Sequence, residues 1–213
     1  GNVGVGRIVF SDVAAAEGPL EELSDYGTMG LALLGPPAET SSGGQSAPLS
    51  GRLVGQLGRE LRLAAGESAT VTFVLAWFFP NLGNIPGMPI QGRHYASRFD
   101  SALAVARHVA ANQARLISQT MLWRDTWYDS TLPHWFLDRT FLNISTLATS
   151  TCHRFEDGRF WAWEGVGSCP GTCAHVWHYA QAAGRLFPEL ERVLRERVDF
   201  GLAMLPNGAI RYR

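Results

Sequence analysis

Residues 1 to about 92 alternate apolar and polar positions in the way that β-strands do. Residues 26–34 form an apolar stretch between segments rich in Gly and Pro, and residues 70–79 are rich in β-branched and aromatic side chains. Between them, leucines at odd positions from Leu53 to Leu63 predict one buried face at a period of two. Residues 65–68 (Ala-Gly-Glu-Ser) predict the turn ahead of the second strand.

From Arg98 onward the spacing of apolar positions becomes helical. Apolar side chains recur at steps of three or four residues, or two such steps: Phe99, Leu103, Ala106, Ala110, Ile117 and Met121. Further helices are predicted over residues 133–147, about 175–186, and 188–202. Pro188 suits the first turn of the last one, in which Glu191 and Arg195 form an i,i+4 pair.

Prolines and glycines crowd residues 80–92, and this stretch is the predicted domain boundary. Residues 1–92 are expected to form one domain, a part of an N-terminal β-sandwich, and residues 93–213 a helical domain. A β half followed by an α half predicts an α+β protein in two domains. Both ends of the chain are expected to be cut from a longer protein.

Composition narrows the class of protein. The 213 residues are 46% hydrophobic and 17% charged, with a formal net charge of −1, as in a folded globular protein. No charge run indicates a nucleic-acid or membrane-surface partner, and no apolar stretch reaches the length of a transmembrane helix. Three cysteines are an odd number, which favours reduced thiols over a disulfide framework. With no charged leader ahead of an apolar stretch, the expected location is the cytoplasm.

Residues 157–179 contain the largest number of side chains that could bind a ligand or take part in catalysis. They hold Trp161, Trp163 and Trp177 around a glycine-rich loop, and six of the seven tryptophans lie between positions 123 and 177. Flat amphipathic rings stack on sugar faces, but large aromatic side chains also pack helix cores, so both interpretations stay open.

Glu164 lies between Trp163 and Gly165. A carboxylate among rings is costly unless it is hydrogen-bonded, so it is a candidate catalytic group, while an exposed loop carboxylate is the alternative.

Two further clusters have competing interpretations. Cys169, Cys173, His175 and His178 supply four donors that zinc accepts, but structural zinc sites usually separate two ligand pairs by a dozen or more residues, so no metal is predicted. The second cluster is polar and lies between the first two predicted helices; its members are Arg124, Asp125, Asp129 and His134. One interpretation is that Asp129 or Ser130 caps the second helix, and the other is that the cluster lines the mouth of a site.

Several stretches, in their order and spacing, resemble glycoside hydrolase family 116, which includes non-lysosomal glucosylceramidases and bacterial β-glucosidases. They are residues 63–68 leading into 71–80, 95–99, 129–133 (Asp-Ser-Thr-Leu-Pro), 157–160 (Asp-Gly-Arg-Phe), 163–165 (Trp-Glu-Gly), and 170–177 running on to 186–192. The resemblance implies a β-sandwich followed by an (α/α)6 barrel, of which this chain would contain the first helices.

The resemblance also implies retaining hydrolysis of β-glucosides or related β-glycosides, free or in a glycolipid, without a cofactor. Glu164 takes the place of the nucleophile, and Trp161, Trp163 and His175 are the expected sugar-binding residues; some relatives carry Asp at the position of His175. The family's acid/base, an Asp in a Tyr-Asp motif downstream, has no match here, because Asp199 is the only later Asp. The chain alone is therefore expected to be inactive. Two alternatives to a hydrolase stay open. One is a non-catalytic carbohydrate-binding module, and the other is a transferase or phosphorylase of the same architecture.

Overall fold

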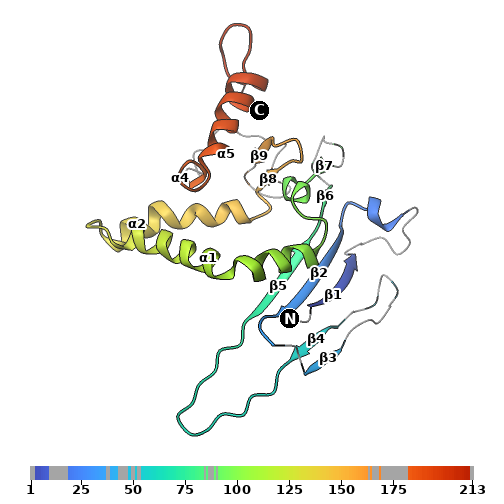
Figure 1. The fold of residues 1–213 in the computed structure, drawn as a ribbon. Helices are drawn as coiled ribbons and strands as arrows, with labels where there is room; N and C mark the ends of the chain where they lie inside the picture. Colours follow the sequence, from blue (N-terminus) through green and yellow to red (C-terminus); the bar gives the residue numbers. More distant parts are fainter. Residues whose placement is uncertain are drawn as a thin grey trace. The chain divides into compact units, whose positions relative to one another are not determined.

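The computed structural model describes residues 3–9, 19–36, 39–42, 48, 51, 54–83, 85, 89, 91–162, 164, 168 and 182–211. The chain is a mixture of helices and small antiparallel sheets (Figure 1). It divides into two compact units, one of residues 1–83 with 95–117, and the other of residues 84–94 with 118–213. The boundary predicted near residue 92, between a β domain and a helical domain, stays a prediction.

The elements of the N-terminal part are mostly strands. They are β1 (Val3–Val9), the 3-10 helix η1 (Leu20–Glu22), β2 (Tyr26–Leu33), β3 (Thr40–Ser42), β4 (Gln56–Gly58), β5 (Phe73–Phe78), β6 (Asn81–Leu82) and β7 (Gln91–Gly92). The elements that follow are mostly helical: η2 (His94–Ser97), α1 (Ala102–Tyr128), α2 (His134–Phe141), η3 (Leu142–Ala148), β8 (Cys152–Arg154), β9 (Phe160–Ala162), α4 (Ala182–Leu186), α5 (Pro188–Val193) and the π-helix η4 (Leu194–Leu202).

The first unit is built on a three-stranded antiparallel sheet in the order β1-β2-β5, with Thr28 opposite Phe78 and Leu33 opposite Phe73. The strands predicted over residues 26–34 and 70–79 are thus confirmed as β2 and β5. One face of the sheet packs against the start of α1. Its core is made of small side chains and one ring, which lets helix and sheet approach closely: Ala32, Ala76, Phe78, Ala102 and Ala106.

Polar contacts from the sheet fix where α1 begins. The side chain of Thr28, 8% exposed, accepts a hydrogen bond from the backbone N–H of Ala102 at 2.9 Å, and Ser101 Oγ accepts one from Ala104. Both satisfy N–H groups that a helix leaves without an internal partner. The apolar spacing predicted a helix from Arg98 onward, but α1 begins at Ala102. After β5, the hydroxyl of Tyr95 accepts from the N–H of Phe79 at 2.6 Å and donates to its carbonyl.

The buried face predicted for residues 53–63 is wrong where the structure describes it: Gly55 is exposed and Leu57 is only half-buried, while Leu53 lies outside the described residues. Leu61 and Leu63 are 45% and 51% exposed, and residues 59–72 form neither helix nor strand. The polar side chains around them make local contacts of their own, such as Glu67 accepting the N–H of Ala64. The turn predicted at residues 65–68 is confirmed, since Gly66 takes a positive φ of 84° and the N–H of Glu67 bonds to the carbonyl of Ala64.

The second face of β5 is apolar and exposed. Phe73, Leu75 and Trp77 are 47%, 59% and 57% exposed, whereas Phe78 on the opposite face is 7% exposed.

We expect Trp77→Thr to lower binding of a hydrophobic dye by the isolated chain and to leave its folding intact, because exposed apolar patches bind such dyes and promote association. Phe78→Thr, one residue away, should instead destabilise the unit by about 3 kcal/mol through loss of buried area. Dye fluorescence and chemical denaturation measure the two effects; equal behaviour of the two variants would contradict this assignment of faces.

The second unit joins a small hairpin to a helical segment. β8 and β9 pair antiparallel, with His153 opposite Trp161, and Arg93 forms a β-bridge with Phe155. Phe160 and Ala162 of β9 pack with apolar side chains of three helical elements: Ala183, Leu190, Leu194 and Val198. This core holds the hairpin against α4, α5 and η4.

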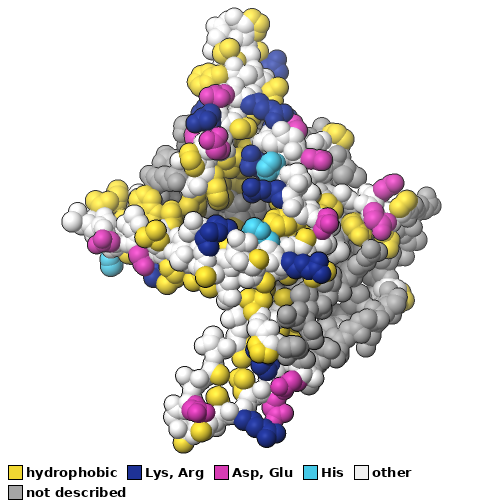
Figure 2. Space-filling view, viewed as in Figure 1, with side chains coloured by type: hydrophobic (Ala, Val, Ile, Leu, Met, Phe, Trp, Pro, Cys, Tyr) yellow, Lys and Arg dark blue, Asp and Glu magenta, His cyan; other side chains and the backbone are white. Residues whose placement is uncertain are grey.

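The helices predicted for this part are confirmed in most of their length. Residues 133–147 contain α2 and η3, and residues 188–202 contain α5 and η4, with Pro188 in the first turn. Arg195 donates to Glu191 at 2.9 Å, as the i,i+4 spacing predicted, and Figure 2 shows acidic and basic side chains interspersed over this segment. Of the helix predicted over 175–186, residues 182–186 form α4, and the rest lies outside the described residues.

The end of α1 and the start of α2 carry exposed apolar side chains, which gather over these two helices in Figure 2. The most exposed are Leu122 (67%), Trp135 (69%), Tyr128 (46%) and Leu132 (45%). None of the described helices combines the length and the apolar character that crossing a bilayer requires.

Candidate functional site

Glu164 follows the hairpin strand β9 after one intervening residue. Phe160, Trp161 and Ala162 are 3%, 2% and 0% exposed, so β9 is buried on both faces. Glu164 itself is exposed. Its side chain is therefore within reach of solvent or of a ligand.

One layer of the hairpin is aromatic. The ring of Trp161 lies 5.6 Å from that of His153 on the paired strand, tilted by 32°. Burial lowers the pKa of His153, and the positive charge of Arg93 lowers it further. The imidazole is therefore neutral near pH 7, and it can pack against an indole without bringing a charge into the unit.

The thiol next to this layer is unreactive. Cys152 has a free, partly buried side chain at the edge of the core. Burial raises the pKa of this thiol, and the hydroxyl of Thr151 opposes the effect only in part. The group is therefore a protonated thiol near pH 7, and the reduced state predicted for the cysteines stays a prediction. Cys169 and Cys173 lie outside the described residues.

The tip of the hairpin is tied to η4 by an ion pair that the sequence did not predict. Arg197 donates to the carbonyl oxygen of Asp157 and to its carboxylate Oδ2, each at 2.6 Å. Asp157 Oδ1 accepts the backbone N–H of Arg159, and Gly158 takes a φ of 86° that favours glycine. The Asp-Gly pair at positions 157 and 158 was a visible turn signal, but nothing in the local sequence points 40 residues ahead to Arg197.

The charge of Asp157 is stabilised in the folded protein. The backbone N–H of Arg159 is the largest cause that lowers the pKa of this carboxyl, burial opposes it, and the charge of Arg197 lowers it further. A carboxyl with a lowered folded pKa adds stability above its unfolded pKa, about 3.9, and that stability is lost as the pH falls through the folded value.

We therefore expect Asp157→Asn to reduce the free energy of unfolding at pH 7 by about 0.5 kcal/mol, since exposed ion pairs contribute little. The asparagine keeps an acceptor for Arg159, so the change isolates the charge. At pH 3 and below, the difference from wild type should shrink toward zero. Denaturation at both pH values measures this, with Glu189→Gln as a matched exposed control. A difference that grows as the pH falls would contradict the assigned sign.

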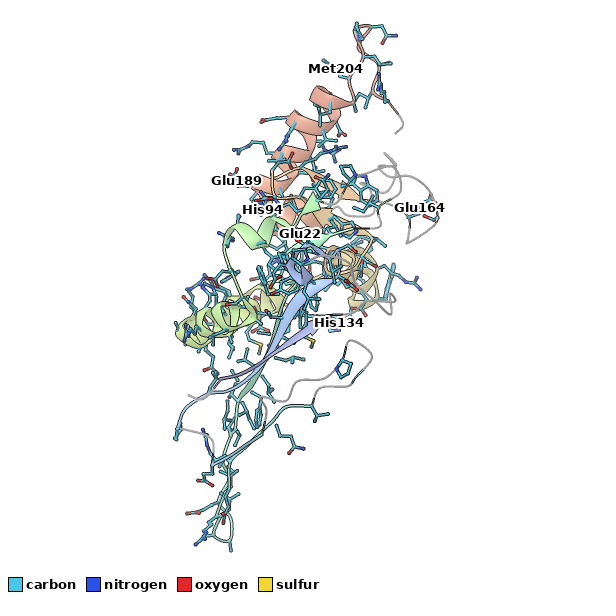
Figure 3. The ribbon with its side chains drawn as sticks, turned by 90° about the vertical axis from the view of Figure 1, so that its right-hand side faces the viewer. Glu22, His94, His134, Glu164, Glu189 and Met204 are labelled. Carbon is cyan, nitrogen blue, oxygen red and sulfur yellow. The ribbon has the colours of Figure 1, made fainter. Side chains whose placement is uncertain are left out.

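Of the other predicted site residues, Trp161 is among those that the structure describes, in β9. Trp163 and His175 lie outside the described residues, as do the four Cys and His donors of the metal hypothesis. Among the residues that the structure describes, no group of three or more metal-binding side chains occurs. In Figure 3, Glu164 and Glu189 lie apart.

The polar group between α1 and α2 forms local contacts. Arg124 donates to Asp125 at 2.7 Å, and both side chains are at least half exposed. Ser130 Oγ accepts the N–H of Leu132, and the ring of His134 lies 5.6 Å from that of Tyr128. These contacts order the turn between the two helices. Leu132 lies ahead of α2, which begins at His134, so the capping predicted for Asp129 or Ser130 stays a prediction.

Comparison of the chain with protein-family models found no match, and comparison with curated proteins found none.

Proposed function

We propose that this chain is part of a retaining β-glycoside hydrolase of the glucosylceramidase and β-glucosidase type, with Glu164 as the nucleophile. The observation that carries the proposal is the Trp-Glu-Gly stretch at 163–165, within an ordered series of stretches that resemble family 116. The exposure of Glu164, two positions after the end of the buried strand β9, supports it. The β-sandwich and (α/α)6 barrel are part of the same proposal.

In this mechanism the carboxylate of Glu164 attacks the anomeric carbon, and the bond from that carbon to the aglycone oxygen breaks. A second carboxyl group protonates the departing oxygen and then takes a proton from the water that hydrolyses the glycosyl-enzyme. In retaining enzymes the two groups lie about 5 to 5.5 Å apart. The second group is assigned to an Asp outside this sequence, so the 213-residue chain by itself should not turn over substrate.

The proposed substrate is a β-glucoside, either free or in a glycolipid, and the reaction needs no cofactor. Trp163 and His175 are assigned to the sugar face and to a hydroxyl group, because indole rings stack on sugars and imidazole forms hydrogen bonds. Trp161 was also expected to bind the sugar, but its side chain is 2% exposed and lies against His153, so the proposal leaves it in the core of the hairpin. A cytoplasmic location belongs to the proposal as well.

The stereochemistry of the product tests the reaction class. Hydrolysis of an aryl β-glucoside by the full-length protein, followed by proton NMR from the first minutes, should show the β-anomer appearing before mutarotation. Initial release of the α-anomer would exclude a glycosyl-enzyme on Glu164. Sugar binding without any turnover would favour the carbohydrate-binding module, and a requirement for phosphate would favour a phosphorylase.

A further inference from the structure

A buried histidine that the proposed chemistry does not use lies in the middle of the β8–β9 hairpin. His153 is 9% exposed and pairs directly with Trp161 of the antiparallel partner strand. The two rings lie 5.6 Å apart, and Trp161 is 2% exposed. Histidine has an ordinary pKa of about 6.5, so mild acid is enough to change its charge. A change of charge at this position would take place inside a closed aromatic layer.

A positive charge already lies beside this histidine. Arg93 forms a β-bridge with Phe155, which follows His153 by two positions. Side chains two positions apart along a strand point to the same face, so Arg93 is at the face of the hairpin that carries His153 and Trp161. The positive charge of Arg93 also lowers the pKa of His153. A protonated imidazole would therefore meet a second cation at a site from which water is largely excluded.

The other groups around His153 do not offset this repulsion. On β9, both neighbours of Trp161 are uncharged, and on β8 the adjacent Arg154 points to the opposite face. A hydrogen bond to the backbone of Ser150 favours the protonated imidazole, but burial and Arg93 each have a larger effect in the other direction. Among the described residues, Arg93 is the charged group that shifts the pKa of His153. The folded hairpin therefore favours the neutral ring.

The hairpin is small enough to respond to one charge. β8 and β9 have three residues each, and two-stranded hairpins of this size have little stability of their own. β9 packs into the core of the helical elements through Phe160 and Ala162, whereas β8 contacts that core, in the described structure, through the partly buried Cys152. β8 is therefore the strand that can separate while β9 stays in place.

We propose that the β8–β9 hairpin is an acid-sensitive element with His153 as its sensor: protonation of the imidazole beside Arg93 separates β8 from β9, and deprotonation restores the pairing. The step is the reversible gain of one proton from solvent. A histidine whose pKa is lowered in the folded state adds stability that is complete above its unfolded pKa, about 6.5, and that is lost as the pH falls through the folded value. Acid therefore opens the hairpin.

Hydrogen exchange of the full-length protein, read by mass spectrometry in peptides that cover residues 150–162, measures this opening. From pH 7.5 to pH 5.5, after correction for the intrinsic exchange rate, the opening equilibrium of the wild type should rise several-fold. The upper limit is about tenfold, because one histidine is taken one pH unit below its ordinary pKa. His153→Phe, which keeps a ring against Trp161, and His153→Gln, which keeps a hydrogen-bond donor, should both abolish the rise.

Arg93→Met removes the neighbouring charge and should make the rise smaller, because the protonated imidazole is no longer repelled. His134→Phe is the matched control, since the ring of His134 also lies 5.6 Å from an aromatic ring, that of Tyr128, but is exposed. It should keep the rise of the wild type. The ratio between the two pH values is compared in each protein, so a variant that is less stable at both still gives a result.

The inference is overturned if the wild type shows no rise, if both His153 variants keep it, or if Arg93→Met leaves it unchanged. The experiment needs no substrate and does not involve Glu164. Its failure would therefore leave the proposed function standing, and failure of the proposed function would leave this result standing.

Discussion

Glu164→Gly in the full-length protein is expected to reduce hydrolysis of β-glucosides by at least about a thousandfold, the scale seen when a nucleophile is removed from an enzyme. The reason is that the glycosyl-enzyme cannot form without this carboxylate. Sodium azide should restore turnover, because the small anion enters the space left by the side chain and attacks the anomeric carbon directly. The product should then be the α-glycosyl azide, with inverted configuration.

The control for this variant is Glu156→Gln, an exposed carboxylate of the same hairpin that precedes the turn at Asp157. It should retain activity, since Glu156 has no place in the proposed chemistry. Undiminished activity of Glu164→Gly would remove Glu164 from the mechanism. A loss that azide does not relieve, together with intact folding, would assign Glu164 a structural role.

Leu194→Ala is expected to destabilise the second unit by about 2 to 5 kcal/mol, because it removes buried methyl groups and leaves a cavity beneath β9. Leu194 is 2% exposed and packs in the core that includes Phe160 and Ala162. Limited proteolysis and chemical denaturation should show the hairpin opening at lower denaturant concentration. Leu202→Ala changes a residue of the same helical element that is 59% exposed, and its effect should stay within about 0.5 kcal/mol. Equal effects of the two variants would contradict this core.

Local patterns of apolar residues predicted where several of the strands and helices lie. The apolar stretch at residues 26–34 and the β-branched run at 70–79 became paired strands, and the helical spacing after residue 98 became α1. The spacing failed at Leu61 and Leu63, since alternation of apolar residues predicts a strand only where a partner strand supplies hydrogen bonds. Residues 59–72 have no regular pairing in the described structure.

Sequence patterns could not predict contacts between residues that lie far apart in the chain. Thr28 bonds to the N–H of Ala102 across 74 positions, and Arg197 binds Asp157 across 40. Neither contact leaves a periodic signal, because each depends on how whole elements pack. For the site, the sequence singled out Glu164 from its neighbours Trp163 and Gly165, but it could not show that the hairpin is anchored at its tip.

The most direct test of the central proposal is the intact mass of the full-length protein after incubation with a 2-deoxy-2-fluoro β-glucoside, followed by peptide mapping. The proposal predicts one added sugar per protein molecule, on the peptide that contains Glu164, and no label in the Glu164→Gly variant. A folded wild-type protein that takes up no sugar, or that carries the sugar on a different carboxylate, would contradict it.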